Sequence, residues 1–275
     1  DKNMSEKQAL QAIRQKIDDI DLQVQVLLNQ RANMAQEVAN IKIANGEQTD
    51  FYRPDREAMV LRQVMERNQG PLDSQEMARL FREIMSACLA AEKPLQVAYL
   101  GPEGSFTQGA TLKQFGGSIA PKPMSTISDV FNAVEQGNAN YGVVPVENST
   151  EGMVSHTLDR FITTPLKING EISLRIHHYL LSKETSLSDV VKIYSHPQAL
   201  AQCRQWLANH CPDCELIAVN SNSKAAEMVA SERGSAAIAA NKAAEIYYLV
   251  TLASNIEDEV DNTTRFLVIG RQDIS

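Results

Sequence analysis

The feature that most constrains the fold is an unbroken apolar repeat near the N-terminus, spaced alternately by three and four residues. It contains one cation and runs through Leu10, Ile13, Ile17, Ile20, Val24, Leu27, Arg31, Met34, Val38 and Ile41. Such spacing places the side chains on one face of a helix and matches a heptad seam. No Gly or Pro interrupts residues 5–44, so we expect one helix on the order of 60 Å long.

A seam of this length exceeds what one small domain covers, so we expect a second copy of the chain to pack against it in a homodimer. A buried guanidinium without a partner costs roughly 3–5 kcal/mol, so Arg31 should meet an anion. Lys42 follows about 20° away around the helix and shares that face. Arg14 points elsewhere, but an antiparallel partner would bring it to the other chain's Arg31. A polar residue that sets a coiled-coil register is the alternative interpretation.

Two further helices are expected before residue 94. The first helix should break at Gly46, and residues 53–57 predict a second start with a proline in its first turn. Asp73 and Glu76 form a capping-box pattern for a third helix, which should stop at Pro94.

Residues 5–92 resemble the all-helical chorismate mutases. The matching residues occur in the order the family uses: Ile13-Arg14-Gln15-Lys16-Ile17-Asp18, Arg31, Lys42 and Asp55-Arg56-Glu57. The resemblance implies an intertwined dimer in which Arg31, and Arg14 of the other protomer, hold the carboxylates of chorismate. It places Lys42 at the ether oxygen, Glu57 at the ring hydroxyl and Arg56 in the same cluster.

The third helix departs from the best-known bacterial pattern of that family. Glu92 replaces the glutamine that donates to the ether oxygen, Cys88 replaces a nearby serine, and Arg53 replaces an aspartate in the second helix. Glu92 donates only when protonated, so the pH dependence of a mutase stays open. Chorismate rearranges to prephenate within one molecule, without nucleophile, metal or redox cofactor. Catalysis then requires holding the compact conformer and stabilising charge on the ether oxygen.

After Pro94 the pattern changes to short apolar strands that alternate with helical stretches. We expect helices over 198–209 and 223–232, and strands around 97–100, 141–146, 172–181, 190–194, 216–219, 236–240 and 266–269. This alternation predicts an α/β arrangement. We expect an all-α domain over 1–93 and an α/β domain over 94–275. The α/β domain should have two lobes, and the chain should cross between them near residues 172 and 262.

Residues 95–270 resemble the prephenate dehydratases. The motifs are Gly101-Pro102-Glu103-Gly104-Ser105-Phe106-Thr107, Val144-Pro145-Val146-Glu147-Asn148-Ser149-Thr150-Glu151-Gly152, Tyr194-Ser195-His196-Pro197-Gln198-Ala199-Leu200 and Asn262-Thr263-Thr264-Arg265-Phe266. The resemblance implies two α/β lobes like those of bilobal solute-binding proteins, with the active site in the cleft. It makes Thr264 the main catalytic candidate and ties Arg265 to the substrate carboxylate or to the framework of the cleft.

The loops that carry these motifs suit a carboxylate ligand. Gly-rich turns and Ser, Thr and Asn clusters at strand ends offer N–H and O–H donors without basic side chains, although each one alone is more often a capped turn. Prephenate dehydration expels CO2 and hydroxide as the ring becomes aromatic. We expect Thr264 to donate a hydrogen bond to the leaving hydroxyl. The remaining candidates for orienting prephenate are Ser105, Asn148, Ser149, Thr150, Arg265 and Phe266.

Other reactive side chains have simpler interpretations. A zinc or redox site is one interpretation of Cys203, His210, Cys211 and Cys214, but a second ligand pair is missing, so we expect reduced thiols and no metal. Of His177 and His178, one should be buried and one exposed. His196 should cap a helix or brace the cleft.

Composition fits a cytoplasmic enzyme without a cofactor. The net charge of −8 disfavours a nucleic-acid partner, and no apolar run predicts a membrane span or a signal peptide. Proteins that join these two enzyme units usually continue into an ACT domain that binds phenylalanine. The sequence ends at Ser275 without one, which leaves open a truncated chain or an enzyme without this regulation.

The sequence thus predicts a bifunctional chorismate mutase/prephenate dehydratase, an isomerase and a lyase of phenylalanine biosynthesis, with chorismate and prephenate as substrates. One alternative is a binding module, in which the cleft senses an aromatic acid and a helical domain without catalysis forms the dimer. A coiled-coil adaptor is a second alternative, but it leaves Lys42, Arg56 and Glu57 unexplained.

Overall fold

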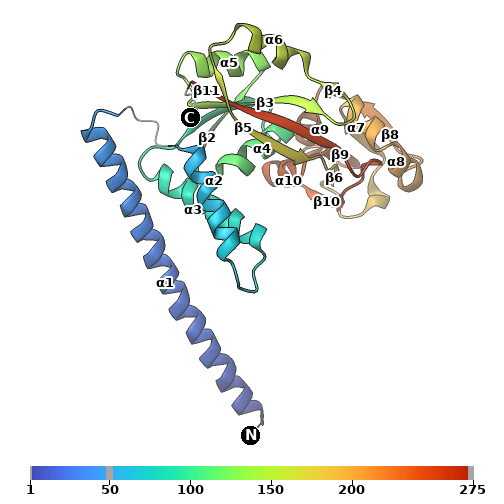
Figure 1. The fold of residues 1–275 in the computed structure, drawn as a ribbon. Coiled ribbons are helices and arrows are strands. Elements are labelled where there is room, and N and C mark those ends of the chain that lie inside the picture. Colours follow the sequence, from blue (N-terminus) through green and yellow to red (C-terminus); the bar gives the residue numbers. More distant parts are fainter. Residues whose placement is uncertain (1, 48–51, 272–275) are drawn as a thin grey trace. The chain divides into compact units, whose positions relative to one another are not determined.

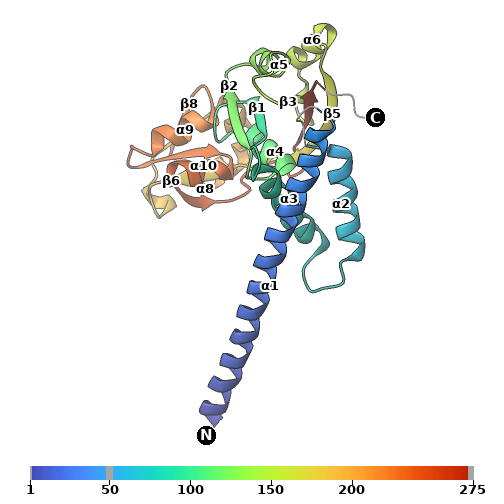
Figure 2. The ribbon, with the colours of Figure 1, turned by 90° about the vertical axis from the view of Figure 1, so that its left-hand side faces the viewer.

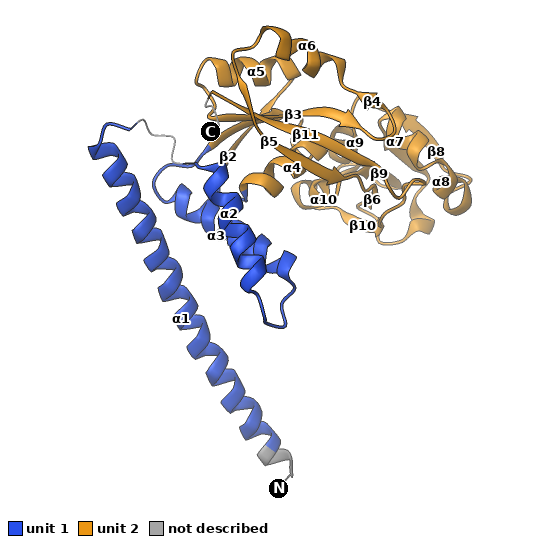
Figure 3. Ribbon diagram, viewed as in Figure 1, with its two compact units in different colours: residues 1–95, 116–119 blue, residues 96–115, 120–275 orange. Residues whose placement is uncertain are grey.

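The structure is a computed structural model that describes residues 2–47 and 52–271. The chain forms two compact units (Figures 1 and 3). Unit 1 contains residues 1–95 and 116–119, and unit 2 contains residues 96–115 and 120–275.

Helix α1 (Lys2–Ala44) is a single helix of 43 residues, drawn without interruption in Figure 2. It ends where Gly46 adopts a positive φ of 76°, a conformation that favours glycine. The predicted helix and its stop are thereby confirmed. The apolar members of the repeat are 48–62% exposed in the single chain.

Helices α2 (Pro54–Arg67) and α3 (Ser74–Ala90) complete unit 1 and pack against each other. The Asp73 side chain caps α3 by accepting a 2.8 Å hydrogen bond from the Gln75 N–H, as expected of an N-cap residue. The second half of the predicted capping box is wrong, because the Glu76 carboxylate binds Arg79 instead.

The first lobe of unit 2 is a mixed sheet in the order β2-β1-β3-β11-β5, with β4 paired to β3. Its strands are β1 (Gln96–Leu100), β2 (Ala120–Met124), β3 (Tyr141–Asn148), β4 (Gly152–Met153), β5 (Lys167–Arg175) and β11 (Thr263–Gly270). The helices of this lobe are α4 (Phe106–Phe115), α5 (Ile127–Glu135) and α6 (Ser155–Thr163). Strands β1 and β3 pair in parallel, whereas β11 runs antiparallel to both β3 and β5.

The second lobe is a sheet in the order β10-β6-β9-β7-β8. Its strands are β6 (Tyr179–Ser182), β7 (Lys192–Ser195), β8 (Glu215–Ala218), β9 (Ser235–Ala239) and β10 (Val250–Ala253). Its helices are α7 (Pro197–Gln202), α8 (Arg204–His210), α9 (Asn222–Val229), α10 (Asn241–Tyr247) and the short 3₁₀ helix η1 (Leu187–Asp189). Every residue of the central strand β9 is buried, and all of them except Ser235 are apolar, as expected of a strand covered on both faces.

Two segments carry the chain between the lobes. Residues 176–178 lead from β5 to β6, and residues 254–262 return from β10 to β11. The segments lie side by side, because the Ile176 N–H donates to the Asn262 carbonyl at 2.8 Å and the Ile256 N–H donates to the His178 carbonyl at 3.0 Å. The continuous strand predicted over 172–181 is therefore wrong. The helix predicted over 198–209 is likewise divided at Cys203 into α7 and α8.

Across residues 2–47 and 52–271, none of the helices combines the length and the apolar character needed to span a bilayer.

Candidate functional site

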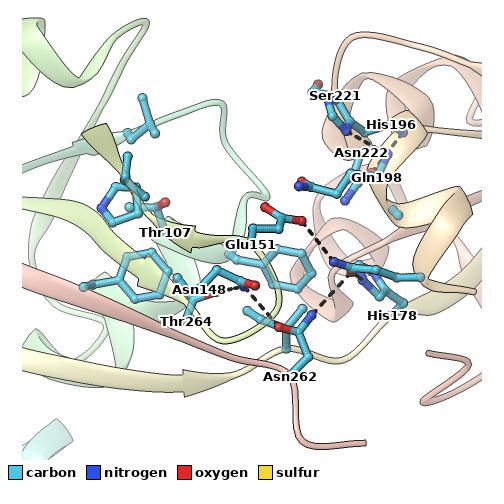
Figure 4. A pocket seen from close by; sticks show the side chains of 18 of the residues that line it. Thr107, Asn148, Glu151, His178, His196, Gln198, Ser221, Asn222, Asn262 and Thr264 are labelled. Carbon is cyan, nitrogen blue, oxygen red and sulfur yellow. Dashed lines mark hydrogen bonds between the residues drawn. The ribbon is translucent and has the colours of Figure 1, made fainter. Parts of the chain in front are cut away.

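A cavity of about 430 Å³ lies between the two lobes of unit 2 (Figure 4). The first lobe contributes Leu100, Gly101, Phe106, Thr107, Pro145, Asn148, Glu151, Val154, Thr264 and Phe266. The second lobe and the two crossing segments contribute Ile176, His178, His196, Gln198, Ala199, Gln202, Asn220, Ser221, Asn222 and Asn262. Donors from both lobes thus surround one volume large enough for a small organic acid.

Strand β11 presents Thr264 and Phe266 to this cavity and turns Arg265 away from it. Successive side chains of a strand point to opposite faces. Of the residues of β11, only Thr264 and Phe266 line the cavity. The Arg265 guanidinium instead binds Glu147 at 2.7 Å and Glu171 at 2.7 and 3.0 Å. Arg265 therefore braces three neighbouring strands as part of the framework of the cleft. The hypothesis that it binds the substrate carboxylate has no support in this geometry.

The orientation of the Asn148 amide fixes the role of the Thr264 hydroxyl. The Thr150 N–H donates to Asn148 Oδ1 at 2.9 Å, so the Asn148 amide nitrogen must face the other way. That nitrogen donates to Thr264 Oγ1 at 2.7 Å and to Asn262 Oδ1 at 3.0 Å. Thr264 is thus an acceptor on its protein side. Among the described residues its hydroxyl proton has no protein acceptor, so the proton remains available to a ligand.

A second set of hydrogen bonds continues from Asn262 into the other lobe. The Asn262 amide donates to Gln202 Oε1 at 3.4 Å, and the Gln202 amide donates to the Glu151 carboxylate at 3.3 Å. Because Gln202 Oε1 is an acceptor, His178 Nε2, which lies 2.6 Å from it, carries the proton. Burial lowers the pKa of His178, so this histidine stays neutral and holds Gln202 in place.

The predicted substrate residues of unit 2 do not all reach the cavity. Asn148, Thr264 and Phe266 line it, and Thr150 supports it by bonding Asn148 through both its N–H and its hydroxyl. Ser105 instead donates to the Leu100 carbonyl at 3.2 Å, and Ser149 accepts from the Thr263 N–H at 3.0 Å. Ser105 therefore stabilises its local turn, and Ser149 joins the end of β3 to the start of β11.

Sequence reasoning missed most of the second-lobe side of this cavity. Ser221 caps α9 through the Lys224 N–H, and the Asn222 carboxamide accepts from Ser195 at 2.7 Å. Their signal was a run of small polar residues after an apolar strand, a pattern shared by ordinary capped helices. His178 was expected only as one buried member of a pair. The buried member is confirmed, since His178 is 2% exposed, whereas the His177 side chain is half-buried, at 31% exposed, and binds Glu257.

None of the described residues that line this cavity is Lys or Arg. A carboxylate here would meet amide, hydroxyl and imidazole donors. The ring of a ligand would meet apolar side chains, notably Phe106 and Phe266. His196 caps α7 by accepting from the Gln198 N–H at 3.2 Å, as expected.

A second cavity, of about 300 Å³, lies within unit 1. Its walls come from all three helices and consist of Arg31, Ala35, Val38, Ala39, Lys42, Tyr52, Arg53, Arg56, Glu57, Val60, Met85, Cys88, Leu89 and Glu92. The predicted residues Arg31 and Lys42 share this cavity with Arg56, Glu57, Cys88 and Glu92. Arg14 does not line it, because seventeen residues of helix separate Arg14 from Arg31 by about 25 Å.

Glu57 is the most perturbed carboxylate of this cavity. Burial raises the pKa of Glu57 to about 7, and the nearby Arg82 guanidinium opposes this rise. Arg82 Nη1 donates to Glu57 Oε1 at 2.9 Å, and the Glu57 side chain is 15% exposed. The cavity therefore combines four cationic side chains with one carboxylate that changes charge near neutral pH and with Glu92.

The cysteines of the second lobe belong to its core. Cys203 and Cys211 are buried in an apolar cluster, and burial raises the pKa of Cys211 to about 11. The Cys214 thiol donates to the Val190 carbonyl. Across the described residues, no three His, Cys, Asp or Glu side chains gather as a metal site.

The fold and the two cavities define a class of two-unit enzymes, with a helical unit that carries a cationic cavity and a two-lobed α/β unit that carries a cleft. Family models match in the same order: chorismate mutase type II over residues 13–93 and prephenate dehydratase over residues 97–274. The predicted resemblances and the predicted fold class of both units are thereby confirmed.

Similar proteins make the relationship specific. A bifunctional chorismate mutase/prephenate dehydratase of Stutzerimonas stutzeri is 56% identical and one of Pseudomonas aeruginosa is 54% identical, each match covering 98% of this chain and 75% of the relative. A crystal structure of prephenate dehydratase in complex with L-Phe from Arthrobacter aurescens matches with a TM-score of 0.60 and 32% identity, over 65% of this chain and 61% of that one. The chain belongs to the family of bifunctional chorismate mutase/prephenate dehydratases.

Proposed function

We propose that unit 1 rearranges chorismate to prephenate and that unit 2 converts prephenate to phenylpyruvate, two consecutive steps of phenylalanine biosynthesis. One observation carries the proposal. Residues from separate motifs of each family, scattered along the chain, meet in one cavity per unit. The cavity of unit 1 also has the cations that its reaction needs.

The cationic cavity suits the rearrangement of a dicarboxylate. Arg31 and Arg56 would hold carboxylates, and Lys42 would stabilise the negative charge that develops on the ether oxygen as the bond breaks. Enclosure by three helices would hold the substrate in its compact conformer. Holding the reacting atoms in this orientation lowers the activation barrier. Glu57 would accept a hydrogen bond from the ring hydroxyl. Glu92, in its neutral form, would donate a hydrogen bond to the ether oxygen.

A second copy of the chain would complete this site. The apolar row of α1 is about half exposed in the single chain, and an uncovered row of this length favours association. Arg14 lies too far along α1 to reach the cavity of its own chain. An antiparallel partner would bring Arg14 to Arg31, so we propose a homodimer with two shared mutase sites.

In the cleft, Thr264 would assist the departure of the ring hydroxyl. Asn148 donates to Thr264 Oγ1, which leaves the hydroxyl proton directed at a ligand. As the carboxyl group leaves as CO2, its bonding electrons aromatise the ring and expel hydroxide, which Thr264 stabilises by donating a hydrogen bond. A threonine hydroxyl is a weak acid, so this role needs hydrogen bonding and no full proton transfer.

The cleft would recognise the carboxylates of prephenate with neutral donors. Thr107 lines it on the same side as Thr264, and Ser221 and Asn222 line it on the opposite side. Amide and hydroxyl donors bind anions without a basic side chain. Phe106 and Phe266 would pack against the ring. Asn148, Asn262 and Gln202 would fix the geometry of these donors through the hydrogen bonds between them.

The experiment is to supply the purified chain with chorismate, and separately with prephenate, and to quantify prephenate and phenylpyruvate by chromatography. We expect both products from chorismate and phenylpyruvate alone from prephenate. A chain that binds these acids without converting them would refute the proposal and favour the binding-module interpretation.

A further inference from the structure

Arg82 lies behind the mutase cavity and does not line it. Its side chain, 25% exposed, projects from α3 to Glu57 on α2, where Nη1 donates to Oε1 at 2.9 Å. Among the described residues, no hydrogen-bond donor binds Glu57 Oε2. One oxygen of this carboxylate is therefore fixed by Arg82, and the other is left for the cavity.

We propose that Arg82 is a positioning residue of the mutase site, which holds the Glu57 carboxylate ionised and oriented to accept the ring hydroxyl of chorismate. This inference rests on the mutase function proposed for unit 1. Arg82 acts through Glu57 and does not touch the substrate.

The surroundings of Glu57 explain why Arg82 is needed. Burial makes ionisation of this carboxyl costly, and the substrate that enters the cavity is itself an anion. The charged groups that line the cavity with Glu57 are Arg31 and Lys42 from α1, Arg53 and Arg56 at the start of α2, where Arg53 is the N-cap residue, and Glu92 just after α3. The carboxylates of chorismate would form ion pairs with the cations that line the cavity. Arg82 approaches from outside the cavity, so its charge remains available to Glu57.

A second arginine of α3 provides a matched control. Arg79 lies one helical turn before Arg82 and pairs with Glu76 at the surface, where the Arg79 side chain is 61% exposed. Replacing Arg79 by methionine removes the same charge from the same helix without touching Glu57. Any effect of net charge or helix propensity should be shared by both variants.

The test is the pH profile of mutase kcat/KM in the full chain, for wild type, Arg82→Met, Arg82→Lys and Arg79→Met. We expect wild-type kcat/KM to rise with the ionisation of Glu57. Because an opposite charge at this distance lowers a carboxyl pKa by about one to three units, Arg82→Met should move the midpoint upward by at least about one pH unit. Below that midpoint its kcat/KM should fall about tenfold for each unit of displacement.

The remaining variants separate positioning from a structural role. Arg82→Lys should restore the midpoint, because it keeps the charge, and Arg79→Met should match wild type. In a Glu57→Gln background, Arg82→Met should leave the profile in place. Arg82→Gln replaces Arg82→Met if the methionine variant does not fold.

Three outcomes would contradict the inference. An equal loss of kcat/KM at every pH in Arg82→Met would show that Arg82 only joins α2 to α3. A displacement that persists without Glu57 would show that Arg82 acts through another group. If neither wild type nor Arg79→Met forms prephenate, the mutase proposal itself fails.

Discussion

Thr264→Val should remove prephenate dehydration and leave chorismate rearrangement intact. Valine keeps the shape of threonine and deletes the hydroxyl that would meet the leaving group. Loss of one preorganised hydrogen-bond donor at a developing charge lowers kcat by a factor of about 10²–10³. Asn148 Nδ2 loses its 2.7 Å acceptor but keeps Asn262 Oδ1 at 3.0 Å. The free energy of unfolding should therefore fall by only about 1 kcal/mol.

The neighbouring threonine supplies the control. Thr263 precedes Thr264 on β11 and does not line the cleft. Among the described residues, its hydroxyl donates only to the Asp261 carbonyl. Thr263→Val should retain dehydratase activity within a small factor. The assay follows chorismate, prephenate and phenylpyruvate together, with folding monitored by circular dichroism. If folded Thr264→Val made phenylpyruvate at the wild-type rate, or lost both activities together, the assignment of Thr264 would be refuted.

Three further predictions concern unit 1. Mixing inactive Arg14→Ala and Arg31→Ala proteins should restore about a quarter of the mutase activity, because half of the dimers regain one of two shared sites; no recovery after confirmed subunit exchange would refute the shared site. Glu92→Gln keeps a hydrogen-bond donor of similar size and should retain mutase kcat, whereas Glu92→Ala should lose it, and both should spare the dehydratase; equal mutase kcat in the two variants would exclude Glu92 as the donor. The pKa of Glu57, raised to about 7 from its ordinary 4.5, means that the folded chain binds more protons than the unfolded chain between these values. In urea unfolding, the free energy of unfolding of wild type should fall by up to about 3 kcal/mol as pH rises through this window, whereas that of Glu57→Gln should not. Equal losses would show that Glu57 is not the group responsible for this pH dependence.

The long helix could be predicted because its period was unbroken and its stop contained a glycine. The two sheets were harder. Strand β2 contains Pro121 and Pro123, which argue against a strand in most contexts, yet it lies at the edge of its sheet, where a proline costs no ladder hydrogen bond. The run from 172 to 181 was uniformly strand-like, and no local signal marked its passage between lobes at 176–178.

The sites show the same division. Spacing along one helix placed Arg31 and Lys42 in a common cavity, because helical geometry is local. Arg82 and Glu57 lie 25 residues apart on different helices, so only tertiary packing brings them together. In the cleft, the motif around Thr264 was visible, but the direction of Arg265 depends on the alternation of a strand whose register a sequence does not state.

The central claim is that one chain holds two sites that act in order, and a time course of chorismate consumption tests it most directly. The assay records chorismate, prephenate, phenylpyruvate and CO2 in the same reaction of the purified wild-type chain. We predict that prephenate appears first and then declines, while phenylpyruvate and CO2 accumulate in equal amounts until they match the chorismate consumed. Chorismate that stays unchanged, or prephenate that accumulates without any CO2, would contradict the account.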